Sequence, residues 1–344
     1  MNTAPNSVPF AGLPPEYAIP EHAPSLADAR AYCERLARSH YENFSVATWF
    51  LPARLRPHFY SVYAYCRISD DLGDEVGDPL ESLRLLDEWE GELNACYNVL
   101  RWGTASAGPQ AAGLGKGTTV VVSQNALPGE GVLAPGDIGP RHPVFVALLD
   151  TIRACDIPRQ PFADLLKAFR QDQTVGRYPT FDEVLDYCCY SANPVGHLVL
   201  YVCGYRDEER QQLSDFTCTA LQLANFWQDV WPDYGKGRIY IPLDDLQRYG
   251  VTEQDIAARR PTSQFRELMK FQVERARQWF VHGLPLARKV DKELAIDIEL
   301  FSRGGQQILN AIKRQNYDVL TSRPAISKAG RLALVTRAAL GKLL

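Results

Sequence analysis

The chain has 344 residues, of which 46% are hydrophobic, so it is long enough to bury a sizeable core in one large domain or two small ones. A formal net charge of −4 provides no basic field of the kind that binds nucleic acid, and no nucleic-acid partner is expected. The eight cysteines include no C-x-x-C pair, which argues against a zinc site and against a disulfide scaffold.

The N-terminal residues are rich in Pro and Ala, and we expect residues 1–24 to form a flexible lead-in. They show no basic segment followed by an apolar stretch, so no signal peptide is evident. No window of the sequence approaches the roughly 18 consecutive apolar residues that a membrane span needs. We therefore expect a cytoplasmic protein, with peripheral contact on the inner face of the cell membrane as an additional possibility.

Helical patterns dominate from residue 25 onward. Pro57 stands where a first helical turn tolerates proline, and it predicts a helix over about 56–76. Gly77 and Pro79 end that helix and start another. The pattern breaks at residues 103–142, which are rich in Gly, Pro, Ala and Ser, and we interpret them as a surface insertion.

Helical segments resume beyond the insertion. Thr180 and Glu183 make a capping-box sequence at the start of a helix over about 181–203. Pro194 lies inside this helix and should kink or interrupt it. Strand-like alternation is almost absent, so we predict one all-α domain over residues 25–320.

The first candidate site is the run Arg67-Ile-Ser-Asp70-Asp71-Leu-Gly-Asp74-Glu75. Residues four apart on a helix project from nearly the same side, so Asp70 and Asp74 form a paired carboxylate edge, with Arg67 beside it. Carboxylates at this spacing repel each other and slightly destabilise a helix. A bound divalent cation would neutralise them.

The second candidate site lies in apolar, aromatic helical sequence. Asn225, Asp229 and Asp233 recur at a spacing of four and should line one edge. Carboxylates buried in such a helix are costly unless they are paired or bound to metal. Lys236 and Arg238 follow directly and are suited to neutralise phosphate charge.

Oxygen ligands of this kind suit Mg²⁺, which usually takes one or two protein carboxylates together with substrate phosphate oxygens. Two acidic edges that face each other would hold a diphosphate between them through bound metal. One such pair alone is common on a solvated helix face. Two pairs in apolar sequence, each with basic residues nearby, form a much more specific signal.

These segments resemble the head-to-head prenyl synthases, the family of squalene and phytoene synthases. The match consists of Tyr65-Cys-Arg-Ile-Ser-Asp-Asp-Leu-Gly-Asp-Glu75 and Gln222-Leu-Ala-Asn-Phe-Trp-Gln-Asp-Val-Trp-Pro-Asp-Tyr-Gly-Lys-Gly-Arg-Ile-Tyr-Ile-Pro242. It extends over about residues 39–324, apart from the insertion. The resemblance implies an all-α, single-domain isoprenoid synthase fold, whose central cavity binds prenyl diphosphates and Mg²⁺ between the two Asp-rich helices.

Within that family the sequence is most similar to the bacterial hopanoid-pathway subgroup HpnC, the hydroxysqualene synthases. The run Ser191-Ala-Asn-Pro-Val-Gly196 stands where carotenoid and squalene synthases generally have Val-Ala-Gly-x-Val-Gly, so the cavity wall should differ. The resemblance implies that presqualene diphosphate and water give hydroxysqualene and diphosphate. It implies Mg²⁺ as cofactor and no NADPH.

The resemblance also implies roles for individual residues. The expected Mg²⁺ ligands are Asp70, Asp74, Asn225, Asp229 and Asp233, and the same four aspartates are expected to be catalytic together with Tyr187 and Asn193. The expected diphosphate-binding residues are His40, Arg67, Lys236 and Arg238. The expected cavity residues are Phe44, Tyr63, Gln222 and Tyr240. The aromatic residues among them, together with Tyr187, either stabilise a carbocation or belong to the hydrophobic core.

Asn193 is expected to position the attacking water, because an amide both donates and accepts hydrogen bonds. The alternative is that its side chain bonds the backbone group that Pro194 leaves without a partner.

The C-terminal residues 321–344 carry five basic residues and no acid, and their apolar residues form a possible stripe. We expect this amphipathic tail either to rest on an anionic membrane or to be a docking segment. Pathway enzymes are further candidate partners. Two alternative functions stay open: head-to-head condensation of two farnesyl diphosphates to presqualene diphosphate, squalene or a phytoene-type product, and a noncatalytic helical lipid-binding protein.

Overall fold

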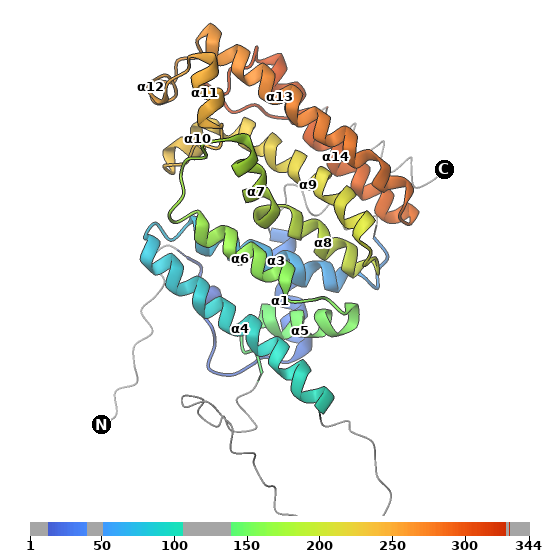
Figure 1. Ribbon diagram of the computed structural model, residues 1–344. Coiled ribbons are helices and arrows are strands. Elements are labelled where there is room, and N and C mark those ends of the chain that lie inside the picture. The colour runs from blue at the N-terminus through green and yellow to red at the C-terminus, as the bar shows by residue number, and fades with distance from the viewer. Residues whose placement is uncertain (1–12, 40–50, 106–138, 328–329, 331–344) are drawn as a thin grey trace, which may run out of the picture.

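The computed structural model describes residues 13–39, 51–105, 139–327 and 330 (Figure 1). Within these ranges the chain is helical and contains no strand, and the one β-bridge joins Arg177 and Ile239. The predicted all-α fold is therefore confirmed. No helix in the same ranges is long and apolar enough to cross a lipid bilayer.

In chain order the helices are η1 (Pro15–Tyr17), α1 (Leu26–Ser39), α3 (Arg56–Asp74), α4 (Pro79–Ala105), α5 (Pro143–Cys155), α6 (Gln160–Gln171), α7 (Phe181–Ser191), α8 (Asn193–Val202), α9 (Glu208–Gln228), α10 (Val230–Gly235), α11 (Leu243–Tyr249), α12 (Glu253–Ala257), α13 (Ser263–Gly283), η2 (Leu284–Arg288) and α14 (Lys292–Arg314).

Two helix groups enclose two hydrophobic clusters. Helices α1, α3, α4 and α5 pack on one another around the first cluster, and α9, α13 and α14 pack around the second. Figure 1 shows these groups at opposite sides of the molecule, with α6, α7 and α8 between them. Helix α6 contacts α3, and α8 contacts both α3 and α9, so the middle helices set the position of α3 relative to α9.

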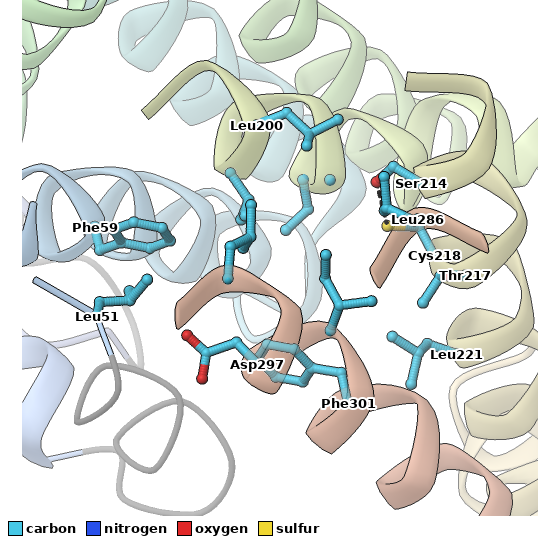
Figure 2. Close-up of a pocket in the computed structure, with 15 residues that line it drawn as sticks. Leu51, Phe59, Leu200, Ser214, Thr217, Cys218, Leu221, Leu286, Asp297 and Phe301 are labelled. Atoms are coloured by element: carbon cyan, nitrogen blue, oxygen red, sulfur yellow. Dashed lines mark hydrogen bonds between the residues drawn. The ribbon is translucent and has the colours of Figure 1, made fainter. Parts of the chain in front are cut away.

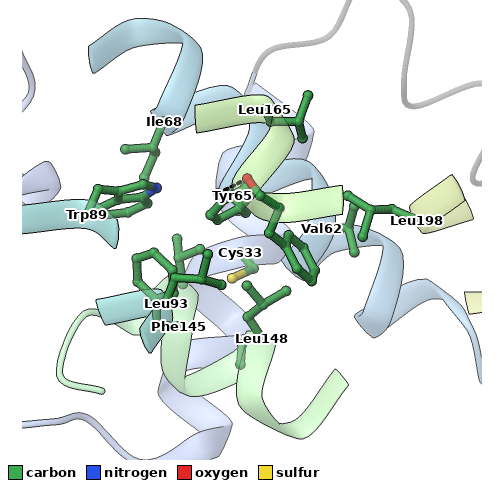
Figure 3. Close-up of a cluster of buried hydrophobic side chains, with 14 of the residues drawn as sticks. Cys33, Val62, Tyr65, Ile68, Trp89, Leu93, Phe145, Leu148, Leu165 and Leu198 are labelled. Carbon is green, nitrogen blue, oxygen red and sulfur yellow. Dashed lines mark hydrogen bonds between the residues drawn. The ribbon is translucent and has the colours of Figure 1, made fainter. Parts of the chain in front are cut away.

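Helix α3 is held firmly just before its acidic end. The ring of Tyr65 is fully buried and lies edge-on to Phe145 and Phe162, and its hydroxyl donates to the Phe162 carbonyl at 2.8 Å (Figure 3). On the next turn, the Trp89 indole donates to Ser69 Oγ at 2.9 Å. Burial of each large apolar side chain stabilises the fold by about 1.5–3 kcal/mol, so this end of α3 is a rigid platform.

The N-terminal segment differs from the prediction. Residues 13–24 do not form a flexible lead-in, because Leu13 and Tyr17 are buried against the first cluster. The Tyr17 hydroxyl donates to Asp71 Oδ2 at 2.7 Å, which ties this segment to α3. Propensity alone does not reveal such a long-range contact. The part of the prediction that concerns residues 1–12 lies outside the described residues.

The ends of the predicted insertion, residues 103–142, belong to the folded part. Helix α4 continues to Ala105, and the ring of His142 is buried and caps the start of α5. The Glu92 carboxylate accepts the backbone N–H of His142 at 2.7 Å, which fixes the point where the chain re-enters the fold. Residues 106–138 lie outside the described residues.

The predicted interruption at Pro194 is confirmed. Helix α7 ends at Ser191 and α8 begins at Asn193, with Ala192 between them at φ −122° and ψ −51°. Proline lacks the N–H that would continue the helix, and its ring clashes with the preceding turn. The wall made by α7 and α8 therefore bends at this point.

Candidate active site

The first acidic edge lies at the C-terminal end of α3, as predicted. Asp74 accepts hydrogen bonds from Arg238 Nη1 at 2.7 Å and from Lys236 Nζ at 3.0 Å, both of which lie in the loop after α10. Burial opposes ionisation of Asp74, but the charges and hydrogen bonds of these two cations outweigh it and lower the pKa of the carboxyl. The fold thus joins the two sequence motifs directly.

Asp70 lies one turn earlier on the same helix and keeps contact with solvent. The protein around its carboxyl nevertheless displaces much of the water, and the negative charge of Asp74 adds to that effect. Together they raise the pKa of Asp70 to about 7. Within the described part of the chain, no basic side chain forms an ion pair with Asp70.

Arg67 borders this edge as predicted, since its positive charge acts on Asp70, but its hydrogen bonds go elsewhere. Its guanidinium pairs with Asp71, one helical turn further on, with Nε donating to Oδ2 at 3.0 Å. Asp71 is buried and also accepts the Tyr17 hydroxyl, so it competes successfully for the guanidinium. Diphosphate binding by Arg67 stays a prediction, and it would require the guanidinium to be shared with, or leave, Asp71.

The second acidic edge contains a break that the spacing of four does not reveal. Helix α9 ends at Gln228, and α10 begins after Asp229, which adopts φ −109° and ψ 20°. The cause is Pro232, which has no N–H for the Gln228 carbonyl. The helical bonds from Asp229 N to Asn225 O and from Asp233 N to Asp229 O remain, both at 2.9 Å, so the three predicted ligands still follow one another.

The two acidic edges lie close together. Burial raises the pKa of Asp233 to about 7, with a further contribution from the negative charge of Asp229 and a smaller one from Asp74 on α3. Arg238 and Lys236 act on Asp233 in the opposite direction. Acids and bases from both motifs therefore share one electrostatic environment.

Asp229 has a partner that sequence reasoning missed. Arg323, in the segment after α14, donates through Nη2 to Asp229 Oδ2 at 2.9 Å and through Nε to the other carboxylate oxygen. The neighbouring Gln228 side chain donates to the carbonyl of Pro324 at 2.6 Å. The first residues of the predicted tail, 321–344, are thus bound to the α9–α10 junction, and most of the others lie outside the described residues.

A further acid, Asp172, belongs to this cluster and lies in neither motif. It caps the C-terminal end of α6, and its Oδ2 accepts the Tyr187 hydroxyl at 2.7 Å. Its Oδ1 lies 3.4 Å from the Tyr240 hydroxyl, and its backbone carbonyl lies 3.4 Å from Arg238 Nη2. Burial is the main cause that raises the pKa of Asp172 to about 6. No second acid at helical spacing marks it in the sequence.

The loop after α10 positions Arg238 by a close backbone approach. Gly237 has φ +80°, and a Cβ on Gly176 would lie 2.6 Å from the Gly237 carbonyl oxygen, so neither position accepts a side chain readily. Ile239 N donates to the Gly176 carbonyl at 2.8 Å. The Nε of Arg238 is buried and has no hydrogen-bond partner among the described residues, and an anion would provide one.

Aromatic rings surround Asp172. The rings of Tyr240 and Phe226 stack at a centroid distance of 3.8 Å, and Tyr178 and Tyr187 each lie within 5.6 Å of Tyr240. One face of Tyr240 is therefore covered by another ring. This arrangement favours core packing for much of the set, and a contact of Tyr187 or Tyr240 with a carbocation stays a prediction.

An apolar pocket of about 210 Å³ lies between α3, α8, α9, η2 and α14 (Figure 2). Phe59 on α3 and Thr217 on α9 line it, and each precedes the acidic end of its helix by three turns or more. At 1.5 Å per residue, the nearest lining residues of the two helices, Leu221 and Phe59, lie roughly 12–17 Å before Asp229 and Asp70. The predicted cavity residues Tyr63, Gln222 and Tyr240 are not among its lining residues.

Asn193 lies at the start of α8 and is buried. Its Oδ1 accepts the Thr219 hydroxyl of α9 at 3.0 Å, and it does not line the pocket. This hydrogen bond of Asn193 thus goes to a side chain of α9 and not to the backbone near Pro194. A role in positioning water stays a prediction. The predicted residues His40 and Phe44 lie outside the described residues.

The acids fit a metal that a diphosphate helps to bind. Among the described residues, no three His, Cys, Asp or Glu side chains come close enough to hold a metal ion by themselves. Asp70 and Asp233 nevertheless carry raised pKa values, because burial and a neighbouring carboxylate disfavour their negative charges. A divalent cation would compensate them, and Mg²⁺ commonly completes its coordination with phosphate oxygens and water.

Comparisons with known proteins agree with this geometry. The family model of squalene/phytoene synthase matches residues 36–330. The squalene synthase HpnC from Alicyclobacillus acidocaldarius is 40% identical, with a TM-score of 0.70 over 90% of this chain and 99% of that one. A phytoene synthase from Arthrospira platensis is 28% identical over 314 residues, covering 86% of this chain and 88% of that protein.

A dehydrosqualene synthase structure, 22% identical, shares the fold with a TM-score of 0.72 over 92% of this chain and 96% of that one. The matched region includes both acidic edges, the Arg238 loop and the helices that line the apolar pocket. The chain belongs to the squalene/phytoene synthase family.

Proposed function

We propose that the protein is a hydroxysqualene synthase, which converts presqualene diphosphate and water to hydroxysqualene and diphosphate. The observation that carries the proposal is the 40% identity to HpnC over nearly the whole chain, taken together with the resemblance of the sequence to the hydroxysqualene synthases. The HpnC structure itself is described as a squalene synthase, and squalene formation belongs to the second candidate function. The Asn193-Pro194 pair supports the hydroxysqualene proposal, because the resulting break between α7 and α8 falls where the sequence resembles the hydroxysqualene synthases.

In this proposal the substrate diphosphate lies between the acidic edges. Asp70, Asp74, Asp229 and Asp233, with Asn225, would hold Mg²⁺, which supplies Lewis-acid charge withdrawal and a template for the diphosphate. Arg238 offers its buried Nε and Lys236 its ammonium group to phosphate oxygens. Each then exchanges part of its contact with Asp74 for contact with the ligand.

The hydrocarbon chains of the substrate would extend toward the apolar pocket. The pocket begins roughly 12–17 Å along the two helices from the acids, so the chains would reach it from a diphosphate bound between the edges. Most of the lining residues of the pocket are aliphatic or aromatic, with Ser214, Thr217, Cys218 and Asp297 as polar exceptions (Figure 2). The diphosphate leaves with the bonding electron pair, and a water molecule adds to the resulting carbocation.

The second candidate function is the head-to-head condensation of two farnesyl diphosphates, which the phytoene synthase relatives favour. One assay separates the two. Purified protein is supplied with Mg²⁺ and either presqualene diphosphate or farnesyl diphosphate, without NADPH, and the extracted lipids are analysed. We expect hydroxysqualene from presqualene diphosphate. Consumption of farnesyl diphosphate alone would reject the hydroxysqualene proposal.

A further inference from the structure

We infer that Asp172 accepts the proton that is released when water adds to the carbocation. The inference rests on the proposed function and names a residue for one of its steps. The carbon–oxygen bond to diphosphate breaks and both electrons leave with diphosphate. The water oxygen then forms the new carbon–oxygen bond, one of its O–H bonds breaks, and the proton passes to the Asp172 carboxylate and later to solvent.

The position of Asp172 separates it from the two acidic edges. It lies at the end of α6 and reaches the cluster from a third direction. The guanidinium of Arg238 spans the two sites, with Nη1 on the Asp74 carboxylate at 2.7 Å and Nη2 near the Asp172 carbonyl at 3.4 Å. A diphosphate bound by Arg238 therefore places its leaving bond near Asp172.

The hydrogen bonds of Asp172 leave it able to accept a proton. The Tyr187 hydroxyl fixes Oδ2 at 2.7 Å, whereas the contact of Oδ1 with the Tyr240 hydroxyl is long, at 3.4 Å. A carboxylate oxygen has two lone pairs, so Oδ1 has room for a water molecule. The side chain is only partly buried, which leaves a path to that oxygen.

The charge around Asp172 also differs from that around its neighbours. Asp74 and Asp229 are each held by basic side chains, while no ion pair to Asp172 occurs within the described ranges. The side-chain partners of Asp172 are the hydroxyls of Tyr187 and Tyr240. The nearby charge of Arg238 opposes proton binding by Asp172, and burial outweighs it. The raised pKa of Asp172 agrees with this.

The test is the product partition of Asp172→Asn. Diphosphate release is measured by a coupled pyrophosphatase assay, and the alcohol is measured by mass spectrometry of extracted lipids in ¹⁸O-labelled water. We expect release to continue while the alcohol formed per diphosphate released falls about 10-fold or more, in favour of hydrocarbons formed by loss of a carbon-bound proton. Magnesium affinity, measured by calorimetry, should stay within about 2-fold of wild type.

Two tyrosine variants form a matched pair. Tyr187→Phe removes the hydroxyl that fixes Asp172, so it should also lower the amount of alcohol formed per diphosphate released, called here the alcohol share. Tyr178→Phe removes a hydroxyl of the same ring cluster that makes no hydrogen bond to Asp172. Tyr178→Phe should leave the share unchanged. If Asp172→Asn does not fold, as judged by its thermal melting curve, this pair still decides the question.

Three results overturn the inference. First, the alcohol share could be unchanged in Asp172→Asn, or in Tyr187→Phe if Asp172→Asn does not fold. The proton acceptor would then be the departing diphosphate or another group. A large loss of magnesium affinity would make Asp172 a metal ligand. Wild-type protein that releases diphosphate but forms no alcohol would reject the proposed function itself, which the other two results leave standing.

Discussion

At the end of α3, Asp74 is neutralised by two basic side chains, whereas Asp70, one turn earlier, has a pKa of about 7. The second acidic edge repeats this arrangement. Asp229 is held by Arg323, and Asp233 has a pKa of about 7. Each edge thus combines one acid that forms an ion pair with one that forms none among the described residues. The comparison indicates that a divalent cation is needed most at Asp70 and Asp233.

The edges differ in how their compensating cations are supplied. Lys236 and Arg238 follow the second motif closely in sequence, yet they neutralise the acid of the first. The cation on Asp229 comes from Arg323, more than ninety residues later. The first edge therefore depends on the α10 loop, and the second depends on the segment that follows α14.

The largest expected effect comes from neutralising one acid at each edge. Asp70→Asn and Asp229→Asn should each lower turnover of presqualene diphosphate by at least about 10²-fold, because each removes a ligand of the Mg²⁺ that would stabilise the leaving diphosphate. Steady-state kinetics measure this, and thermal melting checks that both variants fold. Wild-type rates in both variants would refute the metal arrangement.

The next effect concerns pH. Folding raises the pKa of Asp70 and Asp233 above the usual value for Asp. The native state therefore binds more protons than the unfolded state over about pH 4–7. Without metal, the free energy of unfolding should fall as pH rises through that range, about pH 4–7. Magnesium affinity should rise over the same range up to about pH 8. Melting temperatures at pH 5 and pH 8, with and without Mg²⁺, test both statements. A double Asp70→Asn, Asp233→Asn variant should lose most of this dependence.

A smaller effect is expected from Arg323→Gln. Metal must compete with the guanidinium for Asp229, so the variant should bind Mg²⁺ more tightly than wild type when diphosphate is absent, by a few-fold. Calorimetry measures the affinity. The pair is partly exposed, so the free energy of unfolding should change by less than about 1 kcal/mol. Weaker magnesium binding in this variant would show that Arg323 supports the metal site instead of competing with it.

The smallest expected effect concerns the packing that holds α3, the helix of the first edge, in place. Tyr65→Phe removes the buried hydrogen bond to Phe162 on the α3 side and should cost about 1 kcal/mol in the free energy of unfolding, measured with urea. Leu80→Ala, at a position that is 79% exposed, is the control and should stay within about 0.5 kcal/mol. A Tyr65→Phe variant as stable as this control would mean that the hydroxyl does not help to fix α3.

Much of this site can be predicted because it follows local rules. Asp70 and Asp74 show their shared edge through helical spacing, and Pro194 shows a helix break through its missing N–H. Asp172 and Arg323 follow no local rule. They reach the cluster only through tertiary packing, one at the end of α6 and the other beyond α14, and a single sequence gives no signal for either contact. The ion pair of Arg67 with Asp71 gives no sequence signal for a related reason, since the burial of Asp71 and its hydrogen bond with the remote Tyr17 appear only in the folded structure.

The guanidinium of Arg238 is only 12% exposed and is already held by Asp74 and by the backbone of Asp172 before any ligand arrives. Immobilising a flexible side chain during binding costs about 0.5–1.5 kcal/mol, and here that ordering takes place during folding. The anion meets a donor whose direction is set in advance. Arg238→Lys would keep the charge and lose this fixed direction, so selectivity for diphosphate over simpler anions should depend on the shape of this side chain as much as on its charge.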